Sequence, residues 1–137
     1  MPRAKLTPTV PSVRPSTPRP WSNVVVVRGT VADEPQKRAV PSGSVFEATV
    51  VTRSVVDGVS VRESVPVVWS DARLSCSAGA EVIVRGRVRQ RFFRSGAATL
   101  SRTEVIAEEI ALASRRPATA KLVDRAVHLV HEVGGST

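Results

Sequence analysis

The sequence has little of the side-chain chemistry that most enzymes and metal proteins use. It contains one cysteine, Cys76, and two histidines among 137 residues. A single cysteine excludes an intrachain disulfide and is typical of a reducing compartment. His128 and His131 have no cysteine or carboxylate cluster around them, so we interpret them as solvated side chains and not as metal ligands. We therefore expect no enzymatic activity, no cofactor and no metal site.

Aromatic residues and long apolar runs are scarce as well. The chain has no tyrosine, three phenylalanines and two tryptophans. Valine dominates the apolar residues, which favours strands over helices. No apolar run approaches the ~20 residues of a membrane helix, and no apolar segment of the kind found in signal peptides follows the basic N-terminus. We expect a cytoplasmic protein without a membrane partner.

Acidic residues are outnumbered. The chain has 12 acidic and 20 basic residues, which gives a formal net charge of +8. This excess indicates a polyanionic partner such as nucleic acid, although a basic surface can also serve solubility alone. Residues 1–22 contain no acid, four basic residues and six prolines. Because proline blocks helix and removes backbone donors, we predict a disordered basic arm over 1–22, which is either a tether for nucleic acid or a mere leader.

From Asn23 the pattern changes to that of β-strands. Five segments have the alternation or the valine content of strands: 23–32, 45–54, 59–69, 81–93 and 101–113. The valine run in the first segment predicts burial on both faces for much of its length. Proline and glycine mark a loop over 33–44. Asp57-Gly58 predicts a tight hairpin between the second and third segments, and Ser70 or Asp71 is a suitable N-cap for a short helix over 70–79.

The order of three strands, a short helix and two strands is that of the OB-fold. We predict an all-β protein with one or two short helices, in which residues 23–113 form a five-stranded OB-fold barrel. Barrels of this kind bind oligonucleotides or oligosaccharides on one face.

Residues 114–137 have a different pattern. Pro117 suits a first helical turn and Gly134 suits the position just past a helix end. Between them, apolar residues recur at helical spacing: Leu122, Ala126, Leu129, Val130 and Val133. We predict an amphipathic helix from about Pro117 to Val133, followed by a tail, and expect its apolar face to pack on the barrel or on a second subunit.

The segment VIVRGRVRQRFF, residues 82–93, has an arginine at every second position from Arg85. Alternate side chains of a strand share a face, so one face carries Arg85, Arg87, Arg89, Arg91 and Phe93. An exposed row of like charges requires an external anion or neighbouring carboxylates. The phosphates of a nucleic acid, with the Phe93 ring as a stacking surface, would meet the first condition. Glutamates of adjacent strands would meet the second: Glu47, Glu63, Glu104, Glu108 or Glu109.

Taken together, these segments resemble the bacterial single-stranded DNA-binding proteins over roughly residues 23–111. NVVVVRGTVADEPQKR is similar to the opening strand of that family, with Gly29, the Glu34-Pro35 pair and Arg38. VPVVWSDAR is similar to the third strand, with Trp69 where the family has an aromatic residue, and AEVIVRGRVRQRFF is similar to the fourth. The resemblance implies an OB-fold that wraps single-stranded DNA with little sequence preference, as a homotetramer or dimer.

The resemblance and the charge pattern together give ten candidate DNA-binding residues: Arg28, Arg38, Arg53, Trp69, Arg85, Arg87, Arg89, Arg91, Phe93 and Arg94. RNA is an alternative ligand, and the implied setting is replication, recombination or repair at the nucleoid. Two positions where the family commonly carries tryptophan fall near Val55 and Glu63, and the final residues HEVGGST lack the family's acidic tip that recruits repair enzymes. These departures imply a divergent paralogue without such recruitment. The alternative is an OB-fold protein-interaction module with weak or lost DNA binding.

Overall fold

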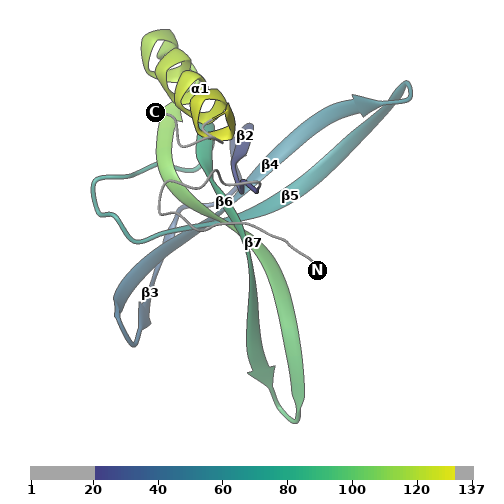
Figure 1. Ribbon diagram of the computed structural model, residues 1–137. Coiled ribbons are helices and arrows are strands. Elements are labelled where there is room, and N and C mark those ends of the chain that lie inside the picture. The colour runs from purple at the N-terminus through teal and green to yellow at the C-terminus, as the bar shows by residue number, and fades with distance from the viewer. Residues whose placement is uncertain (1–20, 132–137) are drawn as a thin grey trace, which may run out of the picture.

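The computed structural model describes residues 21–131, and its strands form a closed barrel (Figure 1). The arm predicted over 1–22 and the tail after the helix, including Val133, lie almost entirely outside the described residues. The strands are β2 (Val25–Val31), β3 (Gln36–Val40), β4 (Gly43–Val56), β5 (Val59–Trp69), β6 (Glu81–Ser95) and β7 (Ala98–Leu112).

Five of these strands make the barrel. The hydrogen-bonded order is β2-β6-β7-β5-β4-β3, and a further pairing of β2 with β4 closes β2, β6, β7, β5 and β4 into a ring. β5 and β7 are parallel, whereas the other pairs are antiparallel. This closed five-stranded barrel is an OB-fold, which confirms the predicted fold class.

Two tight turns set the register of the long hairpins. Asp57 (φ 51°) and Gly58 (φ 78°) connect β4 to β5 in the left-handed region, as a type I′ hairpin turn requires. The predicted Asp-Gly hairpin is therefore confirmed. Gly96 (φ 61°) and Ala97 connect β6 to β7, where Ser95 lies opposite Ala98. Each turn fixes which residues lie opposite one another along the hairpin that it closes.

The barrel interior is built mostly from valines that alternate along the strands. The buried core cluster is Val31, Val50, Val67, Trp69, Val82, Val84, Val105 and Ala107. Phe46 stacks on Trp69 with ring centroids 5.9 Å apart, and the indole Nε1–H donates a hydrogen bond to the Leu74 carbonyl at 3.1 Å. Trp69 is thus the largest member of a core with few aromatic residues.

Three local predictions are wrong. Part of the expected loop over 33–44 is strand β3, which pairs with β4. No helix forms over 70–79, because Asp71 accepts a hydrogen bond from the Arg73 backbone N–H at 2.9 Å and so favours a turn over a helix. Hydrogen bonds from Arg73 lower the pKa of Asp71 to about 2. In β2, Val26 is 44% exposed, so the valine run is buried on only one face of the single chain.

The C-terminal helix α1 (Arg116–His131) forms close to its predicted bounds. It packs on β2, β6 and β7, and Leu122 and Ala126 are its buried residues. Val127 and Val130 remain exposed. No helix in the described part of the chain is long and apolar enough to cross a membrane.

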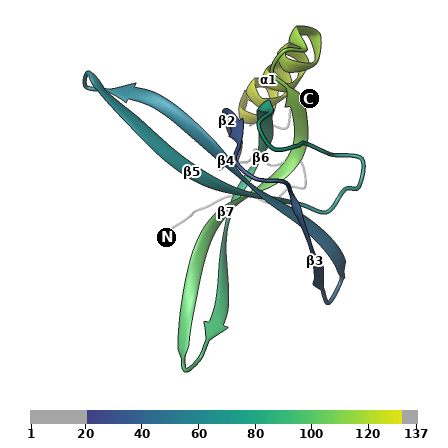
Figure 2. The same cartoon turned by 180° about the vertical axis from the view of Figure 1, so that it is seen from behind.

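The strands extend beyond the barrel as hairpins. β4–β5 and β6–β7 project in different directions, and β3 with the start of β4 forms a third, shorter projection (Figure 2). β6 and β7 have 15 residues each, so only one end of this hairpin belongs to the barrel wall. The projecting end of β6–β7 carries most of the arginine segment.

Candidate nucleic-acid interface

The arginines of β6 share one face of the strand, as the sequence predicts. Val82 and Val84 are buried in the core. Successive side chains of a strand point to opposite faces, so Arg85 and every second residue after it point away from the core. Arg87, Arg89 and Phe93 lie directly opposite Ile106, Glu104 and Leu100 of β7. Opposite residues of an antiparallel pair share a face, so the acidic side chain of Glu104 joins the arginine face.

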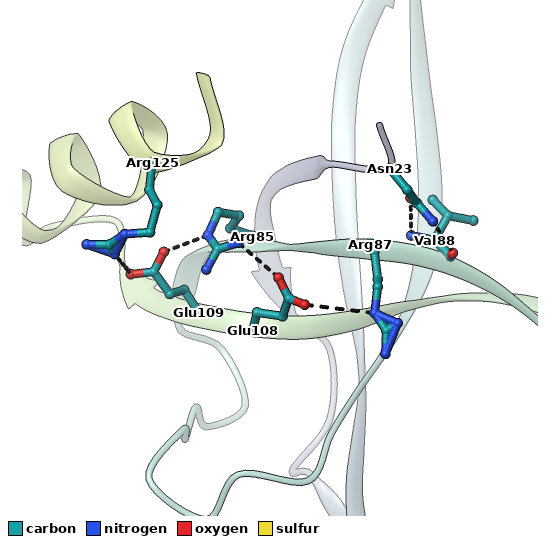
Figure 3. Close-up of polar contacts among 7 residues, drawn as sticks. All are labelled: Asn23, Arg85, Arg87, Val88, Glu108, Glu109 and Arg125. Carbon is teal, nitrogen blue, oxygen red and sulfur yellow. Dashed lines mark hydrogen bonds and ion pairs between the residues drawn. The ribbon is translucent and has the colours of Figure 1, made fainter. Parts of the chain in front are cut away.

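A β-bulge changes the chemistry at the barrel end of this face. Arg85 lies opposite Glu109, but the next residue, Gly86, lies opposite Ala107, which leaves Glu108 as the extra residue of β7. Arg85 therefore contacts two carboxylates: its Nε is 2.7 Å from Glu109 Oε1 and its Nη1 is 2.9 Å from Glu108 Oε1 (Figure 3). Glu108 also reaches Arg87 at 3.8 Å.

Helix α1 adds a further cation to this cluster. Arg125 Nη1 is 2.6 Å from Glu109 Oε2, so Glu109 bridges Arg85 of β6 and Arg125 of α1 (Figure 3). Arg85 is only 7% exposed. Arg85 is a predicted DNA contact, and in the structure its guanidinium is buried and paired with Glu108 and Glu109, the second of which links it to helix α1.

Glu104 neutralises part of the next section of the face. It is 1% exposed, and its two carboxylate oxygens accept hydrogen bonds from Arg89 Nη2 at 2.5 Å and from Arg91 Nε at 3.5 Å. A charged group this well buried requires such partners. Because Arg89 and Arg91 share a single carboxylate, this group of three residues keeps a positive charge.

The far end of the hairpin combines cations and aromatic rings. The Arg91 guanidinium carbon lies 5.0 Å from the centroid of the Phe93 ring, a cation–π contact. Phe92 is 65% exposed on the opposite face, and by alternation Arg94 shares that face. Arg102 lies directly opposite Arg91. Between residues 86 and 103 the hairpin carries five arginines and no acidic residue.

The chain enters the barrel beside this surface. The Asn23 amide Nδ2 donates to the Val88 carbonyl, and the Val88 N–H donates to Asn23 Oδ1, both at 2.9 Å (Figure 3). These two hydrogen bonds resemble those of a β-ladder pair. They extend the β2–β6 pairing two residues beyond its last pair, Val25 with Gly86. They fix Asn23 between Arg87 and Arg89 along β6.

Trp69 does not belong to this surface. It is 2% exposed and packed between Phe46 and the rest of the core. Trp69 is a predicted stacking residue, and in the structure its ring stacks on Phe46 inside the core and its indole N–H donates to the Leu74 carbonyl. Trp21, by contrast, is 84% exposed.

The remaining predicted arginines lie on other parts of the barrel. Arg38 of β3 pairs with Glu47 of β4 at 3.2 Å, and Arg28 of β2 pairs with Glu81 at 2.7 Å. Arg53 lies on the β4–β5 hairpin, directly opposite Arg62. Six of the ten predicted residues thus lie on β6, and the other four, Arg28, Arg38, Arg53 and Trp69, lie at separate positions.

The sequence interpretation missed three candidates that the structure adds: Arg62, Phe92 and Arg102. Their signal was present in the two turns. Counting outward from Asp57-Gly58 places Arg62 opposite Arg53, and counting from Gly96-Ala97 places Arg102 opposite Arg91. Phe92 alternates with Arg91 and Phe93 and so lies on the other face of β6, which has no core to pack on beyond the barrel.

Comparison with known proteins supports the fold. No family model and no curated protein matches the chain. Among solved structures it is similar to a Plasmodium falciparum SSB in complex with ssDNA, with a TM-score of 0.60, 18% identity, and coverage of 69% of this chain and 96% of that chain. The shared feature is the OB-fold. At this identity the likeness shows the fold alone.

Proposed function

We propose that this OB-fold protein binds single-stranded DNA with little sequence preference, in replication, recombination or repair at the nucleoid. The observation that carries the proposal is the projecting half of the β6–β7 hairpin, which has five arginines and two phenylalanines between residues 86 and 103 and no acid. We also propose that the chain is a divergent relative of the bacterial single-stranded DNA-binding proteins.

The chemistry of this hairpin suits a single strand. Guanidinium groups bind phosphates through several donors in a fixed plane, and exposed aromatic rings stack on bases whatever their sequence. Arg87, Arg94 and Arg102 supply the charge, and Phe93 with Phe92 supplies the rings, one on each face. Arg28, Arg38 and Arg53 are further phosphate contacts in this proposal. RNA offers the same phosphates and bases, whereas the likeness to an SSB solved with ssDNA favours DNA.

Fluorescence anisotropy with labelled poly-dT at several salt concentrations tests this proposal. If about four phosphates are neutralised, log K falls against log salt with a slope of roughly −3. Tryptophan quenching is a poorer probe, because Trp69 is buried. A flat salt response, or no binding at low salt, would contradict the proposal.

A second candidate function is that of a protein-interaction module. Glutamates pair with Arg85, Arg89 and Arg91. The ring of Trp69 is buried in the core. Apolar side chains also gather elsewhere, where Val24 and Val26 lie beside Ala126, Val127 and Val130 of α1. Val26, Val127 and Val130 are exposed. A flat salt response would favour this second function.

The same apolar surface supports a homo-oligomer. Among residues 21–131, β2 pairs with β4 only at Thr30 and Val31 and approaches it at Gly29, so one edge of β2 from Val25 to Arg28 has no strand beside it. An unpaired edge next to exposed valines is suited to pairing with a second copy. Light scattering is expected to show a mass above that of one chain, and Val26→Glu is expected to lower it. Val55→Glu, at an exposed valine of the β4–β5 hairpin, is the matched control.

A further inference from the structure

Trp21 is a large aromatic ring that the barrel leaves in water. The chain has two tryptophans. Trp69 is buried under Phe46 in the core, whereas Trp21 is 84% exposed. Indole rings have the largest apolar surface of any side chain and bind well to other flat rings. Trp21 is therefore the one tryptophan that is available to a ligand.

Asn23 fixes the place of this ring relative to β6. Its side-chain amide exchanges two hydrogen bonds of 2.9 Å with the backbone of Val88 (Figure 3). Trp21 precedes Asn23 by two residues, and two residues of extended chain span at most about 7 Å. The segment that carries the ring is therefore held at the edge of the β6–β7 hairpin.

The chain that leads back from β2 runs toward the tip of this hairpin. β2 is antiparallel to β6, and its pair nearest the tip is Val25 with Gly86. Asn23 lies two residues further back and bonds Val88, two residues further along β6, so the antiparallel course continues. Trp21 therefore lies on the tip side of the barrel wall, where β6 carries its exposed arginines.

The surroundings of Trp21 carry positive charge. Arg87 and Arg89 stand on either side of Val88 in β6, and both side chains are about half exposed. On the other side of Trp21, residues 1–20 include four basic residues and no acid. Rings set among cations are typical of surfaces that bind single strands, where bases stack and phosphates meet the cations.

We propose that Trp21 is a base-stacking residue of the single-strand site, and that Asn23 is the positioning residue that holds it beside the arginines of β6. This inference rests on the proposed function. A second copy of the chain is the competing occupant of the ring. However, Trp21 is not among the described residues that line the apolar surface between β2 and α1, and the Asn23 bonds direct it toward the arginines instead.

Three substitutions of Trp21 test the stacking role in anisotropy titrations with labelled poly-dT. Trp21→Ala is expected to weaken binding by roughly 5- to 150-fold, the range for one stacked base. Trp21→Phe retains a ring and is expected to retain part of the affinity. Trp21→Leu retains apolar surface without a ring and is expected to bind as weakly as the alanine variant. Wild-type affinity in the alanine or leucine variant would overturn the proposal.

Tryptophan emission gives a second readout, one that is specific for Trp21. The chain has no tyrosine, and Trp69 is buried. Emission of the wild type is therefore expected to fall on addition of poly-dT, and that of Trp21→Phe to stay constant. An equal fall in both proteins would contradict the stacking role.

Asn23→Ala tests the positioning role. It is expected to weaken poly-dT binding by less than Trp21→Ala does. The double variant is expected to bind as weakly as Trp21→Ala alone, because positioning has no effect once the ring is gone. Ser22→Ala, at the exposed neighbouring residue, is the control and is expected to bind as the wild type does. Thermal melts check that each variant folds, and additive losses in the double variant would contradict the role of Asn23.

The outcomes separate this inference from the proposed function. Binding of poly-dT that is the same in the wild type and in Trp21→Ala contradicts the stacking role alone. No binding by the wild type at low salt contradicts the proposed function, and the stacking role with it. Unchanged binding together with a lower mass of Trp21→Ala in light scattering would assign the ring to a second copy and overturn the proposal.

Discussion

Glu109 joins Arg85 in the barrel wall to Arg125 in helix α1, with N–O distances of 2.7 and 2.6 Å. The carboxylate of Glu109 thus binds two arginines that are 40 residues apart in the chain. Arg85 has almost no access to water, so its charge depends on this pairing and on Glu108. Through Glu109, Arg85 therefore helps to attach helix α1 to the barrel.

Loss of Glu109 is expected to destabilise the fold more than loss of Arg125. Glu109→Gln replaces a charged partner of the buried Arg85 guanidinium with a neutral one. It is expected to lower the free energy of unfolding by about 1–3 kcal/mol. Arg125→Ala removes a half-exposed cation and is expected to cost at most about 1 kcal/mol. Arg116→Ala, in the same helix, is the control. Urea denaturation measures all three, and equal effects of the first two would show that Arg85 does not depend on Glu109.

Neutralising Glu104 is expected to change stability and DNA affinity in opposite directions. Glu104→Gln replaces charge-assisted hydrogen bonds to Arg89 and Arg91 with weaker ones, at an expected cost of about 1–3 kcal/mol. The same change releases positive charge toward a ligand, so the salt slope is expected to steepen by up to about 0.7 for each phosphate gained. Chemical denaturation and the dT titration test this pair of effects. Weaker DNA binding by a folded variant would mean that Glu104 orients the arginines for DNA.

Phe93→Ala is expected to weaken dT binding by ~1–3 kcal/mol, because it removes a stacking surface beside Arg91. That range corresponds to a loss of roughly 5- to 150-fold in affinity. Phe92→Ala, on the opposite face of the same strand, is the matched control and is expected to have the smaller effect. Anisotropy titrations compare the two at one salt concentration. The reverse order would move the stacking face to the Phe92 side of the hairpin.

Gly86→Ala is expected to destabilise the barrel strongly. A Cβ at this position would lie 1.9 Å from the Ile106 carbonyl oxygen, and the clash is with backbone next to the bulge. Overpacking of this kind costs about 1–3 kcal/mol or more. Thermal melting is the measurement, with Ala107→Gly as a substitution on the opposite strand that adds no atom. An unchanged melting temperature for Gly86→Ala would show that the strands can separate here at little cost.

Cys76 is expected to react slowly with alkylating reagents at neutral pH. Burial, with a smaller effect of Glu34, raises the pKa of its thiol above the unperturbed 9.0. A raised pKa in the folded state favours the protonated form. Its contribution to stability is therefore full below pH 9 and is lost as pH rises through the folded pKa. Iodoacetamide rates measured against pH, in the native state and in urea, are expected to show the higher midpoint in the native protein. Coinciding midpoints would contradict this.

The sequence by itself determined the barrel and much of its register. Valine alternation predicts the strands, and the predicted turn at Asp57-Gly58 fixes the partners in its hairpin, because pairing in a hairpin is counted from its turn. The arginine alternation predicts the shared face of β6 for the same local reason. The helix also follows from its own periodicity, since Leu122 and Ala126 recur at helical spacing.

Only the tertiary structure decided what each arginine faces. The bulge at Glu108, the contact of α1 with Glu109 and the burial of Glu104 all depend on contacts between segments distant in sequence. The burial of Trp69 has the same origin, because its position in the barrel end, and not its neighbours in the chain, closes both faces of the ring. Local patterns specify which residues share a face, whereas the packing of distant elements on that face determines which side chains remain available to a ligand.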